Sequence, residues 1–150
     1  GHTVASTSGT TVIAELNRLS RRQRLNIALV PTPDHEAGFE LMASGRVSAF
    51  VMDGILLSNM VANAADPSLF QLSDDTLGPP EPYGLMMRRD DVAFTDAVNA
   101  ALRQIFTQGE IGPLYDKWFQ QPIAPRGINL HLPMSETLVR AFADPAAVED

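Results

Sequence analysis

The sequence lacks cysteine altogether, and this absence leaves the redox compartment open because cytosolic proteins and disulfide-free exported proteins look alike in this respect. No run reaches the roughly 20 apolar residues that a membrane-spanning helix needs. Positive charges are scattered and the net charge is −7, which argues against binding to nucleic acid or to an anionic membrane surface. With 150 residues, 45% of them hydrophobic, the chain can bury one core of ordinary size.

Strand-like and helical patterns alternate in the first half of the chain. Residues 4–6, 26–30 and 48–52 have the apolar, β-branched character of strands, and a helical spacing of apolar residues follows each of them. Residues 69–72 suggest one more short strand. This order predicts an α/β fold whose parallel sheet is covered by helices on both faces, with ligands bound at the carboxyl ends of the strands.

Polar residues occur at each expected strand-to-helix junction. The loop Thr7 to Thr11 combines hydroxyls with one glycine, Asp34-His35 follows the second strand, and Asp53 follows the third. A helix N-terminus with nearby hydroxyls suits a small anion. The first loop has no lysine after its glycine, so it does not match a phosphate-binding loop, and a carboxylate is the better hypothesis.

The second half differs in character after the proline-rich stretch 78–82. Residues 83–87 read as a strand, Asp90 or Asp91 begins a helix that ends at Gly109, and a second helix follows at once. That helix has an aromatic stripe that we expect in the core, namely Tyr115, Trp118 and Phe119. Residues 120–134 read as irregular, and Ser135 begins a last short helix.

Five motifs in this order resemble the second half of the periplasmic binding proteins for polar amino acids, solute-binding protein family 3, and most closely their glutamate/aspartate branch. The motifs are TSGTT at Thr7, DH at Asp34, LMASGRVSAFVMD at Leu41, YGLMMRRDD at Tyr83 and GEIGPLYDKWFQQPIAP at Gly109. Each motif is moderately specific by itself. Together, and with short spacers, they extend over nearly the whole chain.

The resemblance implies a type II periplasmic-binding-protein fold, in which two α/β lobes close on a ligand. Residues 1–82 would form the second lobe, with a parallel sheet flanked by helices. Residues 83–150 would form the returning hinge strand and C-terminal helices that belong to a first lobe, most of which is missing from the chain. It further implies a periplasmic protein that delivers its amino acid to a membrane permease driven by an ATPase.

The resemblance also implies a set of ligand-binding residues. Thr10 and Thr11 match positions that bind the α-carboxylate, His35 matches the contact to the side-chain carboxylate, and Asp53 matches the partner of the α-ammonium. Each residue also has a plainer interpretation, since threonine and aspartate often cap helices and a lone histidine is often an exposed loop residue. Glutamate, aspartate or another polar amino acid remain open as ligands.

An enzyme is the alternative, because related two-lobed proteins include dehydratases of amino-acid precursors, such as cyclohexadienyl or arogenate dehydratase. The sequence shows no nucleophile motif and no Glu/His metal pair. Only His35 and Glu36 could serve as a general acid. We therefore expect no catalytic residue, metal or cofactor. A sensor module built on the same lobes also remains open.

The apolar faces of residues 90–142 lead to an expectation about assembly. Each large side chain left in water forgoes about 2 kcal/mol of burial. We therefore expect a homodimer of the chain, with exchanged C-terminal segments as one form that it could take. In the family, the first lobe supplies an arginine that clamps the ligand carboxylate, so the isolated chain should bind its amino acid weakly or not at all.

Overall fold

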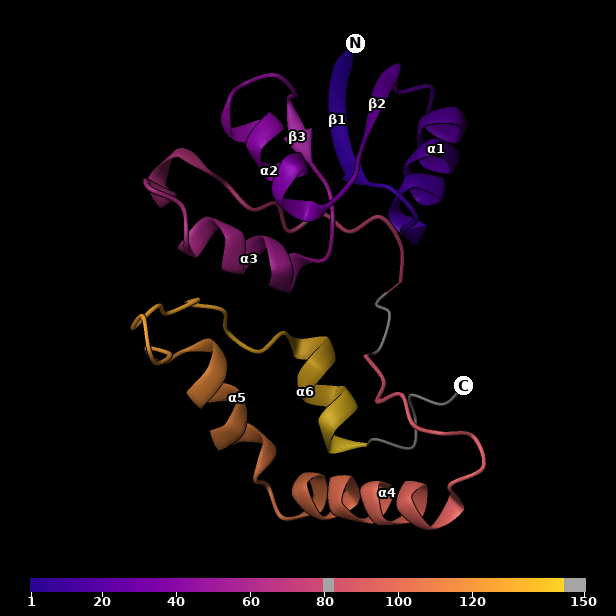
Figure 1. The fold of residues 1–150 in the computed structure, drawn as a ribbon, viewed down its shortest axis with the longest axis vertical. Helices are drawn as coiled ribbons and strands as arrows, with labels where there is room; N and C mark the ends of the chain where they lie inside the picture. Colours follow the sequence, from indigo (N-terminus) through magenta and orange to yellow (C-terminus); the bar gives the residue numbers. More distant parts are fainter. Residues whose placement is uncertain (80–82, 145–150) are drawn as a thin grey trace. The chain divides into compact units, whose positions relative to one another are not determined.

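The computed structural model describes residues 1–79 and 83–144, and it divides into two compact units, Gly1–Glu81 and Pro82–Asp150 (Figure 1). In the first unit three strands form a sheet in the order β2-β1-β3, and both pairings are parallel. Its elements are β1 (His2–Thr7), α1 (Thr11–Gln23), β2 (Ile27–Thr32), α2 (His35–Ala43), β3 (Ala49–Phe50), α3 (Gly54–Ala62) and the 3₁₀ helix η1 (Pro67–Leu69).

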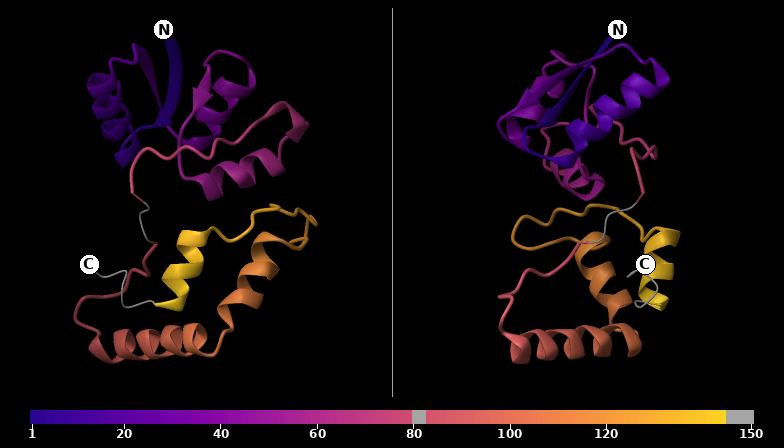
Figure 2. Two further views of the ribbon diagram at one scale, coloured as in Figure 1. Left: turned by 180° about the vertical axis from the view of Figure 1, so that it is seen from behind. Right: turned by 90° about the vertical axis from the view of Figure 1, so that its right-hand side faces the viewer.

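Helices cover both faces of this sheet. The chain moves from β1 to β2 through α1 and then back past β1 to β3 through α2, so two crossovers of the usual right hand place α1 and α2 on opposite faces (Figures 1 and 2). Consecutive residues of β1 agree with this arrangement, because Val4 and Ala5 point to opposite faces and both are buried. The predicted α/β fold with a parallel, helix-flanked sheet is confirmed.

The core of the first unit lies between the sheet and the helices α2 and α3. Ala5, Val47 and Phe50 form its buried centre, against which apolar side chains of α2 and α3 pack. Gly38 lies where α2 comes closest to the sheet, and a Cβ atom at this position would lie 2.3 Å from the Phe50 ring. Glycine is therefore required by the close approach of the helix, although it is a poor helix former.

All three strands of this sheet have bounds that differ from the prediction. β1 spans His2–Thr7 and is longer than the predicted residues 4–6. β2 continues through Pro31 to Thr32, whereas the prediction ended it at the proline. Among the described residues β2 pairs with β1 alone, so it is an edge strand, and an edge strand tolerates a residue that lacks an N–H group. β3 is limited to two residues, although backbone hydrogen bonds at Ser48 and Val51 continue its pairing with β1.

Two further predicted strands are wrong. Residues 69–72 follow the 3₁₀ turn η1 without forming a strand, and residues 83–87 are also irregular. Apolar character alone does not make a strand, because the backbone groups need a paired neighbour, and neither segment has one among the described residues.

The second unit consists of helices joined by irregular segments. These are α4 (Val92–Thr107), α5 (Ile111–Phe119) and α6 (Glu136–Ala143). As predicted, Asp91 and Ser135 cap helices, because the Asp91 carboxylate accepts a hydrogen bond from the Phe94 N–H and the Ser135 hydroxyl accepts one from the Leu138 N–H. Every helix of the described ranges is too short or too polar to cross a lipid bilayer.

The aromatic stripe of α5 is only partly in a core. Tyr115 is buried beside Phe119, with 4.3 Å between ring centroids, and burial raises the pKa of its phenol. Trp118 is 47% exposed, so its assignment to the core is wrong. Its indole instead has the Lys117 ammonium 5.1 Å from the ring centroid, an arrangement typical of a cation–π contact at a surface.

Candidate functional site

The carboxyl ends of the three parallel strands lie at one edge of the sheet. Thr7 pairs with Thr32 at the ends of β1 and β2, and Ala5 pairs with Phe50 at the end of β3. The loops after the strands therefore begin together, and they contain the four predicted site residues. The loop of the central strand lies between the other two.

Thr10 and Thr11 lie at the start of α1. Thr10 occupies the N-cap position, but its hydroxyl donates to the Thr7 carbonyl oxygen at 2.8 Å and does not cap the helix. The plain interpretation of Thr10 as a side-chain cap is therefore wrong. Gly9 makes the turn into the helix possible with a φ of 77°, in the left-handed region. The Thr10 side chain thus leaves the first turn of α1 uncapped, and a helix N-terminus of this kind favours an anion.

His35 is the first residue of α2, and it is joined to the central strand. Its Nδ1 atom lies 2.6 Å from the hydroxyl of Thr7, the last residue of β1. The helix begins here because the Asp34 carboxylate accepts a hydrogen bond from the Ala37 N–H at 2.8 Å. His35 is therefore fixed at both its backbone and its ring, which a mobile loop histidine would not be.

Asp53 follows β3 and begins α3, and its side chain is exposed. The expectation that its carboxylate also caps the helix is wrong. The first turn closes instead on the Asp53 backbone carbonyl, which accepts hydrogen bonds from the N–H groups of Leu56 and Leu57 at 3.0 Å each. The Asp53 carboxylate thus lies at the carboxyl edge of the sheet and does not cap α3.

Buried hydroxyls join the strand ends beneath these residues. Ser6 donates to the Val51 carbonyl oxygen at 3.0 Å and so links β1 to the segment after β3. Thr32 donates towards the carbonyl oxygens of Ser6 and Asp34, at 3.3 and 3.0 Å. The sequence-based choice of site residues missed this layer. A row of small hydroxyl residues at the ends of buried strands was the available signal.

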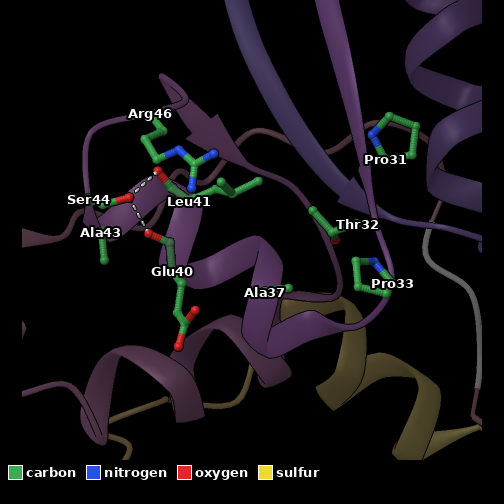
Figure 3. Close-up of a pocket in the computed structure, with 9 residues that line it drawn as sticks. All are labelled: Pro31, Thr32, Pro33, Ala37, Glu40, Leu41, Ala43, Ser44 and Arg46. Carbon is green, nitrogen blue, oxygen red and sulfur yellow. Dashed lines mark hydrogen bonds between the residues drawn. The ribbon is translucent and has the colours of Figure 1, made fainter.

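A hollow lies beside β2 and α2, and it reaches the carboxyl end of β2, where Thr32 and Pro33 line it. Its volume is about 780 Å³, and Figure 3 shows its lining residues, among which the Glu40 carboxylate and the Arg46 guanidinium point away from one another. Thr10, Thr11, His35 and Asp53 do not line it. Across residues 1–79 and 83–144, no group of three or more His, Asp or Glu side chains could hold a metal ion.

Comparison with known proteins gives the chain its family. It is 37% identical over 148 residues to the L-glutamate/L-aspartate-binding protein of Pseudomonas aeruginosa, and 35% identical over 145 residues to the glutamate/aspartate import solute-binding protein of Escherichia coli. The chain belongs to solute-binding protein family 3. The similarity to these proteins covers 97% and 95% of the chain, in agreement with the glutamate/aspartate branch predicted from its motifs.

The chain spans about half the length of the curated relatives it matches, 48% and 47% of these two proteins. The glutamate/aspartate import solute-binding protein of Salmonella typhimurium is 33% identical to the chain over 148 residues. No model of a known protein family matches the sequence. All three relatives are named as binding proteins and none as an enzyme, which supports a role without catalysis.

Proposed function

We propose that the first unit is the second lobe of a periplasmic glutamate/aspartate-binding protein, and that it presents its sheet edge to the ligand. The observation that carries this proposal is the position of Thr10, Thr11, His35 and Asp53 at the carboxyl ends of three adjacent parallel strands. Ligands of open parallel sheets bind at this edge. The names of the relatives supply the chemistry of the ligand.

In this proposal each part of an acidic amino acid has its own partner. The N-terminus of α1, with Thr10 and Thr11, binds the α-carboxylate through N–H groups and the helix dipole. Asp53 pairs with the α-ammonium, and the His35 imidazole donates to the side-chain carboxylate. The two carboxylate sites and the single ammonium site lie on loops that follow different strands, so one extended ligand could engage all three.

The remaining assignments follow from the family. The protein would deliver its amino acid to the permease of an ABC transporter, without turnover and without a cofactor. Residues 83–150 would comprise the hinge segment that returns to the first lobe and the C-terminal helices that belong to that lobe. The exposed apolar side chains of the second unit support a homodimer of this chain, with exchanged C-terminal segments as one form of it. Those above half exposure include Tyr83, Leu85, Met86, Val92, Phe94 and Val139.

Thermal unfolding of the two-lobed protein tests the ligand class. We expect L-glutamate and L-aspartate to raise the melting temperature, because a ligand that binds only the folded state stabilises it by mass action. L-glutamine and L-asparagine should raise it far less, since they lack the second carboxylate. Equal stabilisation by the acids and their amides would contradict the proposed selectivity, and no stabilisation by any of the four would contradict the ligand class.

A further inference from the structure

Thr7 connects the central strand to the ring of His35, and the two residues belong to different strand-to-helix loops. The Thr7 hydroxyl and His35 Nδ1 are 2.6 Å apart, and Thr7 is only 8% exposed. Among the described residues the hydroxyl has no other hydrogen-bond partner. A buried hydroxyl hydrogen without an acceptor is costly, so the hydroxyl is satisfied when it donates to Nδ1.

The other nitrogen of the ring is accessible. Within residues 1–79 and 83–144, His35 Nε2 makes no hydrogen bond. In the same ranges, every side-chain nitrogen or oxygen that is fully enclosed in a buried or partly buried residue has a hydrogen-bond partner. His35 is such a partly buried residue, so its Nε2 atom must be reached by solvent. One ring nitrogen is held inside and the other is open to a ligand.

A hydroxyl group suits this position because it can both donate and accept. When the imidazole is neutral, donation from Thr7 to Nδ1 places the ring hydrogen on Nε2. When the imidazole is cationic, both ring nitrogens have a hydrogen, and Thr7 can only accept from Nδ1–H, which leaves the hydroxyl hydrogen without an acceptor among the described residues. The contact therefore suits the neutral ring with its hydrogen on Nε2. The remaining form, with its only hydrogen on Nδ1, would present a lone pair at Nε2 and repel a carboxylate.

We propose that Thr7 is a positioning residue for acidic-ligand recognition, because its hydroxyl donates to Nδ1 of the neutral His35 ring and so keeps the ring hydrogen on Nε2, where it can face the ligand. This inference rests on the proposed function for its ligand, but the state of the ring can be measured without any ligand. Thr7 also accepts a hydrogen bond from Thr10 through its carbonyl oxygen, at 2.8 Å. The carboxylate-binding turn and the histidine are therefore aligned by the same residue.

Nitrogen-15 NMR of the chain tests the ring, at a pH high enough for a neutral imidazole. We expect His35 of the wild type to show a hydrogen on Nε2 and a bare, hydrogen-bonded Nδ1. Thr7→Val, which keeps the shape and removes the hydroxyl, should change the Nδ1 shift and mix the two neutral tautomers. Thr7→Ser should restore the wild-type spectrum. Thr3→Val, in the same strand but away from the ring, should leave it unchanged.

Calorimetry of the two-lobed protein tests the consequence for binding. We expect Thr7→Val to weaken L-glutamate binding by about tenfold, and Thr7→Ser and Thr3→Val to change it little. A wild-type ring with its hydrogen on Nδ1, or a Thr7→Val protein with unchanged spectrum and affinity, would overturn the role of Thr7. Failure of the wild type to bind any acidic amino acid would refute the proposed function instead, while the NMR result would still decide how Thr7 holds the ring.

Discussion

Asp53 shows that an aspartate at the start of a helix need not cap it with its side chain. Aspartate at the start of a helix normally caps it, but α3 closes on the Asp53 backbone carbonyl and not on its carboxylate. Loss of the charge should therefore leave the start of α3 unchanged. The same reasoning separates Thr10, whose hydroxyl turns back to Thr7, from an ordinary capping threonine.

Asp53→Asn should weaken binding of an acidic amino acid to the two-lobed protein by about 10- to 100-fold, because the α-ammonium loses its charged partner. Asp66→Asn is the matched control, since Asp66 caps the short helix η1 through Ser68 and should not affect the ligand. Equal losses of affinity in both variants would point to a general effect of charge and would contradict the assigned role.

The sequence alone leads to the positions of His35 and Asp53 but not to the contacts that fix them. Thr7 lies inside the loop that the sequence singles out, yet its partner His35 is 28 residues further along the chain. Such a contact depends on the register of β1 against β2, which the local pattern does not encode. The family resemblance assigned roles to four residues, whereas the contact between the Thr7 hydroxyl and His35 could be found only from the folded structure.

At the scale of helices and strands, the close packing of α2 on the sheet makes the sharpest demand on the sequence. Gly38→Ala should lower the free energy of unfolding by about 1–3 kcal/mol, because the new Cβ overlaps the Phe50 ring in the core. Urea unfolding measures this change.

Gly54→Ala serves as its control in the same unit. Gly54 is also a helical glycine, but a Cβ there would meet no atom within 4 Å. Its substitution should be neutral or slightly stabilising, since alanine favours a helix. Similar destabilisation by both substitutions would mean that helix propensity or backbone conformation, and not the contact with Phe50, decides the outcome.

Helices were predicted more accurately than strands, and the physical reason is their locality. Asp34, Asp91 and Ser135 mark helix starts through hydrogen bonds to residues three positions away. A strand depends on a neighbour that is distant in the sequence. Residues 69–72 and 83–87 have the composition of strands, but among the described residues they have no such neighbour and remain irregular.

At the scale of the whole molecule, the exposed apolar side chains of the second unit indicate that the chain associates with another copy of itself. Met86 is 100% exposed and Phe94 is 55% exposed, which is unfavourable for large apolar residues. We expect the chain to form a homodimer in solution, with a mass about twice its 16.3 kDa, in multi-angle light scattering over a range of concentrations. A single monomeric species at high concentration would contradict this expectation.

Recognition of an acidic amino acid is the central claim for the whole protein, and His35 is its most specific part. Calorimetric titration of the two-lobed protein with L-glutamate and L-glutamine, before and after His35→Ala, tests it most directly. His2→Ala, at the opposite end of β1, is the control. We expect His35→Ala to abolish most of the preference for L-glutamate over L-glutamine, and His2→Ala to preserve it. An unchanged preference in His35→Ala would contradict recognition of the ligand's side-chain carboxylate by His35.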